Sequence, residues 1–159
     1  MAQRSMPMEI KETPEMWVVR FGQRLRIPDV RQAAAEYSAI IDRQLAEHRL
    51  EADGPWIFIS HNLPRDSKSL FDWEICRPIR KPVQWDETIE LHHLEPIIVA
   101  SRVHQGSLRS LFTKGYAPLV AEIEMSRHHF SGESREIYHG WNGHGSSYHN
   151  IEIQFGLSR

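Results

Sequence analysis

The chain has 159 residues, a formal charge of −2, 40% hydrophobic residues and 25% charged residues, which are ordinary values for a globular protein. A chain of this length can bury a core and still form a pocket. The near-zero charge and the lack of a long Lys/Arg run argue against direct nucleic-acid binding. No apolar stretch reaches the roughly 20 residues that cross a bilayer, and the first residues lack the apolar core of a signal peptide. We therefore expect a cytoplasmic protein without membrane contact.

The sequence indicates neither a disulfide nor a bound cofactor. Its single cysteine, Cys76, has no internal partner, and we expect a buried structural thiol. His139, His144 and His149 flank a glycine-rich segment, but their spacing fits no standard zinc pattern. No phosphate-binding glycine loop, nucleophile elbow or zinc-protease motif is present. We predict no metal and no cofactor.

The first half of the chain has the pattern strand, helix, strand, strand. Residues 8–21 are rich in strand formers around Pro14, which predicts a strand with a bend. In residues 29–49 apolar side chains recur three and four positions apart, which predicts an amphipathic helix with Asp29 as its N-cap. Residues 55–61 and 71–79 are two short strand-like runs on either side of a polar loop, and a hairpin is favoured.

The second half repeats this order. Residues 88–103 are strand-like, and residues 108–123 have helical spacing with a kink or shifted start expected near Lys114, because Gly115 and Pro118 lie within them. Residues 136–141 and 151–157 predict a strand pair, and Asn142-Gly143 predicts its turn. The similar runs TPEMWVV and LEPIIVA, and EICRPI and EIQFGL, indicate a duplication.

We therefore predict an α+β fold for a single domain, residues 1–159. It consists of tandem duplicated βαββ units, half one at about 8–80 and half two at about 88–158, with an antiparallel sheet and two main helices. A groove between two such halves favours a ligand site.

The best candidates for a ligand site are a carboxylate and aromatic side chains on strands. Glu136 and Tyr138 are two positions apart, so on a strand they face the same side. A carboxylate beside an aromatic ring can hold a lipophilic cation by ion pairing and cation–π attraction. The alternative for Glu136 is a surface carboxylate paired with a base such as Arg135, and the same alternative holds for Glu74.

The tryptophans divide into core and pocket candidates. Trp56 lies within an apolar run, and we expect it in the core. Three others fall on or beside strands that border the predicted groove, and these are Trp17, Trp73 and Trp141.

The motifs along residues 8–157 are MEIKETPEMWVVRF, GPWIFISHN followed by FDWEICRPI, LEPIIVASRVHQGSLRSLF, REIYHGW and IEIQFGL. In this order they resemble the GyrI-like family, the bacterial transcription-activator effector-binding domains that are also fused to regulators of the AraC and MerR types. The resemblance implies tandem βαββ units and an amphipathic or cationic small-molecule ligand. By position it implies that Glu136, followed by Tyr138, is the groove glutamate, and that Glu74 is the acidic residue before the proline of half one. Leu94-Glu95-Pro96 displaces the usual proline by one position.

We predict a small-molecule-binding protein without a DNA-reading domain, because few residues precede the first predicted strand. Two alternatives stay open. One is a hydrolase of electrophilic cyclopropyl-type natural products, in which Glu136 positions or deprotonates a water and Tyr138 donates a proton. The other is a protein-interaction role like that of gyrase inhibitors. No motif distinguishes turnover from capture.

Overall fold

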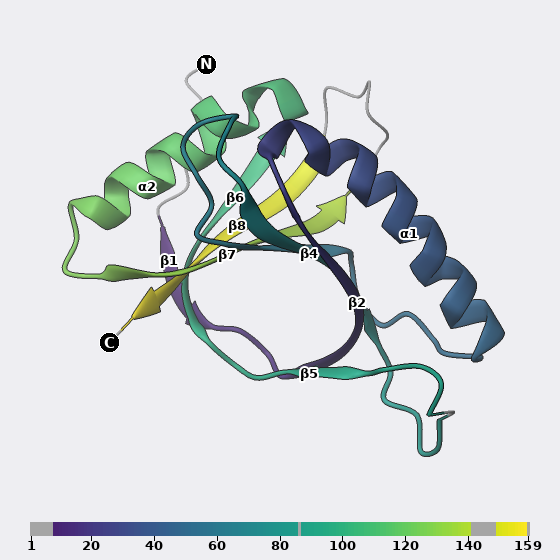
Figure 1. The fold of residues 1–159 in the computed structure, drawn as a ribbon. Helices are drawn as coiled ribbons and strands as arrows, with labels where there is room; N and C mark the ends of the chain where they lie inside the picture. Colours follow the sequence, from purple (N-terminus) through teal and green to yellow (C-terminus); the bar gives the residue numbers. More distant parts are fainter. Residues whose placement is uncertain (1–7, 86, 141–148, 159) are drawn as a thin grey trace. The chain divides into compact units, whose positions relative to one another are not determined.

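The computed structural model describes residues 8–85, 87–140 and 149–158, and the chain divides into two compact units. We call Pro14–Pro96 the central unit, and Met1–Thr13 with Ile97–Arg159 the terminal unit. Each contributes four antiparallel strands and one main α-helix to the described part of the chain (Figure 1). The predicted α+β class, the antiparallel pairing and the repeated order of elements are confirmed.

The central unit is built on the strand order β3-β4-β2-β5, each strand antiparallel to its neighbour. Its elements are β2 (Met16–Leu25), a 3₁₀ turn η1 (Ile27–Asp29), α1 (Val30–Glu47), β3 (Ile57–His61), β4 (Phe71–Ile79) and β5 (His92–Leu94).

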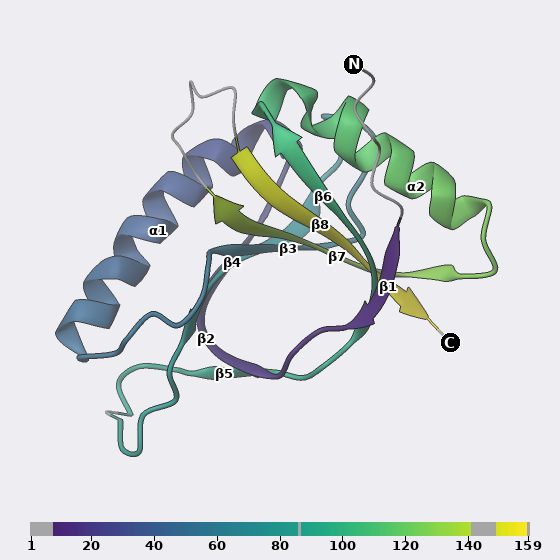
Figure 2. The ribbon, with the colours of Figure 1, turned by 180° about the vertical axis from the view of Figure 1, so that it is seen from behind.

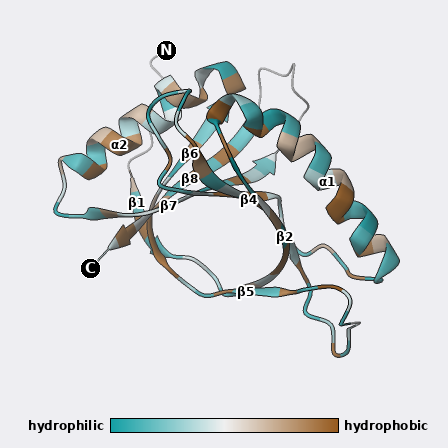
Figure 3. Ribbon diagram, viewed as in Figure 1, coloured by the Kyte–Doolittle hydropathy of each residue, from teal (hydrophilic) through white to brown (hydrophobic). Residues whose placement is uncertain are grey.

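One face of the central sheet carries the core, and α1 covers it. Trp73 and Ile75 of β4 are each 1% exposed and belong to one buried cluster with Ile41 and Leu45 of α1. Apolar and polar segments alternate along α1 in the hydropathy colouring (Figure 3), as expected for a helix with one buried stripe. Because side chains alternate along a strand, the neighbouring residue Glu74 faces the side of the sheet away from α1.

The terminal unit has the strand order β1-β6-β8-β7 (Figure 2). Its elements are β1 (Glu9–Glu12), β6 (Ile98–Gly106), a 3₁₀ turn η2 (Leu108–Ser110), a π-helix η3 (Leu111–Tyr116), α2 (Ala117–Glu124), β7 (His129–Gly140) and β8 (His149–Ser158).

The irregularity expected near Lys114 is the π-helix η3, after which α2 begins at Ala117. Pro118 lies in the first turn of α2, where its missing N–H is tolerated. At Gly115 a Cβ atom would be 2.7 Å from Ile153 Cδ1, so glycine allows the backbone to approach β8 closely.

Two segments predicted as single strands are each divided at a proline. Residues 8–21 form β1 and β2 on either side of Pro14, and residues 88–103 contain β5 and β6 on either side of Pro96. A proline removes a ladder donor and restricts the preceding residue. As a result β1 belongs to the terminal unit and β5 to the central unit.

The start of α1 differs in detail from the prediction. Asp29 precedes the helix as expected, but its carboxylate accepts a hydrogen bond from the backbone N–H of Arg26 at 3.2 Å and caps the 3₁₀ turn instead of α1. The polar loop after β3 has a similar local bond, since backbone N–H groups of Lys68 and Ser69 donate to Asp66 and lower its pKa. The predicted turn Asn142-Gly143 lies outside the described residues.

Candidate functional site

The terminal unit holds a carboxylate between two tyrosine hydroxyls. Glu136 and Tyr138 lie on the same face of β7, and the Tyr138 hydroxyl donates to Glu136 Oε1 at 2.5 Å. The Tyr116 hydroxyl, at the end of η3, donates a short hydrogen bond to Glu136 Oε2. Glu136 is paired in register with Ile153, whose side chain reaches toward Gly115, so this is the face of the sheet that η3 covers.

Burial sets the electrostatics of this cluster. It raises the pKa of Glu136, and the hydrogen bonds from Tyr116 and Tyr138 only partly oppose that effect. Burial and the nearby carboxylate also raise the pKa of both tyrosines well above 10. The phenols therefore remain protonated and act as hydrogen-bond donors at neutral pH.

Aromatic rings surround the carboxylate, and no basic side chain pairs with it among the described residues. Tyr116 stacks on Phe112 at a centroid distance of 5.1 Å and meets Phe155 edge to face at 5.8 Å. Phe155 meets Phe130 in the same way at 5.4 Å. Phe112 is 49% exposed, so the aromatic cluster reaches the surface of the unit. Arg135 pairs with Glu133 at 2.7 Å instead, and the alternative of an Arg135–Glu136 ion pair is wrong.

Tyr116 is a hydrogen-bond partner of Glu136 that the sequence alone did not identify. It comes from a helical segment far from Glu136 in the sequence, and only the fold brings the two together. The signal was the interruption of the helical pattern at Gly115 and Pro118, which marks a π-helix, an element that is frequent at functional sites.

A second carboxylate of the terminal unit, Glu152 on β8, lies on the opposite face of the sheet and is fully hydrogen-bonded. Lys11 Nζ and Ser101 Oγ both lie 2.6 Å from Oε2, and the Gln154 amide donates to the same oxygen at 2.8 Å. His139 Nε2 is 2.8 Å from Oε1. Burial alone would raise the pKa of Glu152, but these four partners outweigh it and lower the pKa to about 2.

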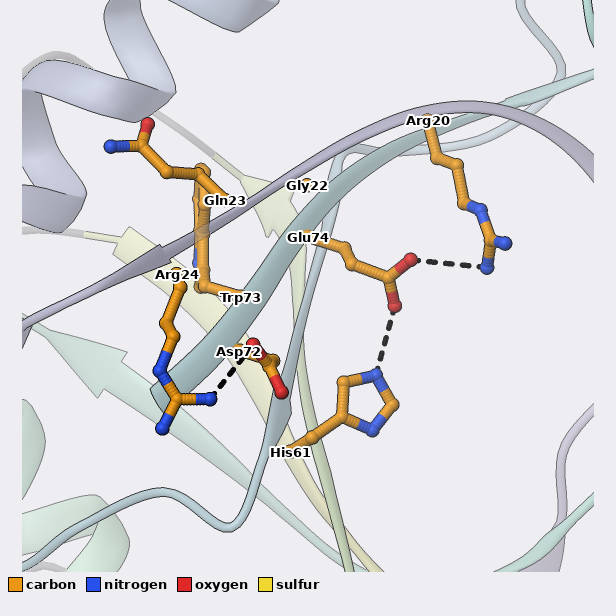
Figure 4. A pocket seen from close by; sticks show the side chains of 8 residues that line it. All are labelled: Arg20, Gly22, Gln23, Arg24, His61, Asp72, Trp73 and Glu74. Carbon is orange, nitrogen blue, oxygen red and sulfur yellow. Dashed lines mark hydrogen bonds and ion pairs between the residues drawn. The ribbon is translucent and has the colours of Figure 1, made fainter. Parts of the chain in front are cut away.

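Glu74 occupies the corresponding position in the central unit. Its Oε1 pairs with Arg20 at 3.0 Å and its Oε2 with His61 Nε2 at 2.9 Å (Figure 4). In each unit the histidine lies 13 positions before the glutamate. In each, too, the histidine lies two positions beyond the residue paired with the glutamate, Ile59 or Ile137. The His–Glu pair is thus a repeated feature of the duplicated fold.

Two of the predicted aromatic walls, Trp17 and Trp73, belong to the central unit, whereas Glu136 belongs to the terminal unit. Trp73 is 1% exposed and packs between Tyr37 and Phe58 in the core of the central unit. Trp17 is partly buried, with Lys81 Nζ 4.6 Å from its ring and the His93 ring at 5.0 Å. Trp141 lies outside the described residues.

Trp56 and the histidines complete the predicted residues. Trp56 packs against the core of the central unit, as expected, and the Arg77 guanidinium lies 4.7 Å from its ring. In the described part of the chain, no group of three His, Cys, Asp or Glu residues could hold a metal ion, and His144 lies outside that part. None of its helices is long and apolar enough to span a bilayer. Cys76 is buried, as expected.

No family model and no curated protein sequence matches the chain. Solved structures match over nearly its whole length. The C-terminal domain of EcmrR is 19% identical, with 96% of this chain and 98% of that chain covered and a TM-score of 0.77. SAV2435 bound to tetraphenylphosphonium is 11% identical, with 96% and 94% covered and a TM-score of 0.59. A hydrolase encoded by lin2189 from Listeria innocua is 12% identical, with 95% and 91% covered and a TM-score of 0.60. At these identities the likeness shows that the chain shares the fold of these proteins.

Proposed function

We propose that the chain is a GyrI-like small-molecule-binding protein and that Glu136 is the anionic anchor for a lipophilic organic cation. The observation that carries the proposal is a carboxylate held by two tyrosine hydroxyls, with no basic side chain on it among the described residues. Among these residues the carboxylate has no counter-ion, and a cation with aromatic or aliphatic substituents supplies one while contacting the rings of Tyr116, Tyr138 and Phe112. The tetraphenylphosphonium bound to SAV2435, which shares the fold, is a ligand of this kind.

The chemistry of the tyrosines favours capture over turnover. In the hydrolase alternative Tyr138 donates a proton, but its pKa is raised well above 10, which makes it a weaker acid than a free phenol. A strongly held phenol that donates a hydrogen bond suits a site that holds charge. Two observations favour the hydrolase alternative. A hydrolase from Listeria innocua has the same fold, and the raised pKa of Glu136 would suit a general base.

The test is a calorimetric titration of the full chain with tetraphenylphosphonium, and with neutral triphenylphosphine oxide as the uncharged probe. We expect the cation to bind more tightly than the oxide, and Glu136→Gln to weaken the cation alone by about 10- to 100-fold. Glu12→Gln, which changes an exposed carboxylate of the same unit, is the matched control and should leave binding unchanged.

Two further readouts separate the alternatives. Cation binding should strengthen as the pH rises through the raised pKa of Glu136, since only the ionised carboxylate attracts the ligand. Mass spectrometry after incubation with strained cyclopropyl electrophiles should recover them unchanged, and recovery with added water would favour the hydrolase. Equal affinity of wild type and Glu136→Gln for tetraphenylphosphonium would contradict the proposal.

A further inference from the structure

The central unit has an open pocket of about 480 Å³ that is lined only by residues of this unit, so that Glu136 does not belong to its lining. Figure 4 shows the Glu74 side chain extending between Arg20 and His61, with a second ion pair, Arg24 to Asp72, farther along the strands. Gly22 is paired in register with Glu74 and contributes no side chain, which leaves space next to the carboxylate. Glu74 faces away from α1, so the pocket lies on the sheet face that the helix does not cover.

The corresponding place in the terminal unit is filled by the chain itself. Glu152 is paired with Val103 of β6, as Glu74 is with Gly22 of β2. Four positions before Val103 is Val99, and its partner on the edge strand β1 is Lys11. The Lys11 ammonium reaches Glu152 at 2.6 Å.

The same positions carry different residues in the central unit. Four positions before Gly22 is Val18, and its partner on the edge strand β5 is His92. His92 pairs with Glu90 at 3.5 Å and also lies within electrostatic reach of Glu74 and Arg20. Cys76 stands where the terminal unit has Gln154, the amide that donates to Glu152. The central unit therefore has no ammonium or amide at the places from which Lys11 and Gln154 reach their carboxylate.

Glu74 is consequently left with acceptor capacity facing the pocket. An ionised carboxylate offers about four acceptor sites. Glu152 has four partners among the described residues, whereas Glu74 has two, Arg20 and His61. Lys11 shows which group this position of the fold accepts, namely a primary ammonium.

The other end of the pocket offers a group for an anion. Arg24 is 64% exposed, and its ion pair with Asp72 is long, at 3.6 Å, so its guanidinium has donors available for a planar acceptor such as a carboxylate. The two arginines and the two carboxylates of the lining balance each other. A ligand that carries one charge of each sign preserves this balance, whereas a simple cation or anion does not.

We propose that this pocket binds a small zwitterion, with its primary ammonium on Glu74 and its carboxylate on Arg24. The site takes a molecule of the size of an amino acid or an ω-amino acid. It shares no residue with the lipophilic-cation site at Glu136.

The experiment is an NMR titration of the full ¹⁵N-labelled chain with 5-aminovalerate, compared with n-butylamine and valerate, which each carry one of its two end groups. We expect saturable shifts for 5-aminovalerate that centre on β2 and β4, and affinities at least about tenfold weaker for the two singly charged probes. Binding of valerate or n-butylamine as tight as that of 5-aminovalerate would overturn the zwitterion assignment. No saturable shift with 5-aminovalerate would overturn the site.

Variants test the geometry. Glu74→Gln and Arg24→Gln should each weaken 5-aminovalerate by about tenfold or more. Gly22→Val introduces the valine that the terminal unit has at the equivalent position. Its Cβ would lie 3.3 Å from Glu74 Cγ, and we expect it to abolish binding while the amide spectrum stays that of a folded chain. Glu136→Gln is the matched control and should bind 5-aminovalerate as the wild type does. A failure of the zwitterion proposal can therefore be distinguished from a failure of the cation-site proposal.

Discussion

Each unit has a His–Glu pair at the same position of its strands, but the further partners of the glutamate differ between the units. In the terminal unit Lys11, Ser101 and Gln154 saturate Glu152. In the central unit Arg20 is the one further partner of Glu74 among the described residues. Duplication has thus kept a backbone register and changed the side chains around it, so one copy is closed by its own chain and the other is open.

On the helix-covered faces the terminal unit has the unpaired carboxylate, and the central unit has an apolar side chain at the equivalent position. Glu136 immediately precedes Ile137, the residue paired with Glu152, and Phe58 holds the equivalent position before Ile59. Phe58 packs edge to face on Trp73 at 5.2 Å. The terminal unit therefore has a carboxylate where the central unit has core. The terminal unit thus has its unpaired carboxylate on the face that the helical segment covers, and the central unit has its open carboxylate on the face away from α1.

The largest loss in the free energy of unfolding should come from a substitution on the apolar, helix-covered face of the central unit. Trp73→Ala removes a side chain that is 1% exposed, and we expect a loss of about 3 to 5 kcal/mol in the free energy of unfolding. Urea unfolding followed by far-UV circular dichroism measures it. Trp17→Ala, at a partly buried position, is the comparison and should cost less. A loss under about 1 kcal/mol for Trp73→Ala would return Trp73 to the candidates for a pocket wall.

The next effect is the dependence of stability on pH that Glu152 produces. The folded-state pKa of Glu152 is about 2, below the ordinary 4.5, so its contribution is present above pH 4.5 and is lost as the pH falls toward 2. The shift corresponds to about 3 kcal/mol. In urea unfolding at a series of pH values, Glu152→Gln should flatten the acid limb.

Glu74→Gln provides the matched comparison in the other unit. Glu74 has two partners instead of four and a side chain that is 18% exposed against 8% for Glu152. We expect Glu74→Gln to lower the free energy of unfolding at pH 7 by less than Glu152→Gln does. An equal loss for the two variants would mean that the extra partners of Glu152 add no stability.

The sequence predicts the features that depend on residues close together in the chain, and it does not predict those that depend on contacts between distant segments. The α1 periodicity, the strands and the duplication are local or repeated patterns, and the alternation along a strand placed Glu136 and Tyr138 together. The contacts of Tyr116 with Glu136 and of Lys11 with Glu152 depend on segments distant in the sequence, and no local pattern encodes them. The place of Trp73 on a strand makes it a candidate for the groove, but its burial depends on the packing of α1, which the sequence alone does not fix.

Glu136 should have a smaller effect on the pH dependence of stability than Glu152, and of opposite sign. Burial raises its folded-state pKa above 4.5, so the folded protein loses stability as the pH rises from 4.5 through that raised value. Glu136→Gln removes the charge, and its amide can accept from one tyrosine hydroxyl and donate to the other. We expect the variant to have a slightly higher thermal midpoint than the wild type at pH 7 and an equal one at pH 4. A lower midpoint at pH 7 would show that the ionised carboxylate stabilises the fold.

The smallest effect tests whether an added amine can replace Lys11 at Glu152 in the terminal unit. Lys11→Ala leaves Glu152 without its ammonium, as Glu74 is in the central unit, and an added alkylamine should take its place. At an amine concentration equal to its Kd the gain in stability is about 0.4 kcal/mol, which differential scanning fluorimetry can resolve over a concentration series. n-Butylamine should therefore raise the thermal midpoint of Lys11→Ala more than that of the wild type. Tetramethylammonium, which has no N–H to donate, should not discriminate between them. Equal responses of the two proteins to n-butylamine would mean that the Lys11 position accepts an ammonium only when the strand itself delivers it, and the argument for an ammonium on Glu74 would lose its internal precedent.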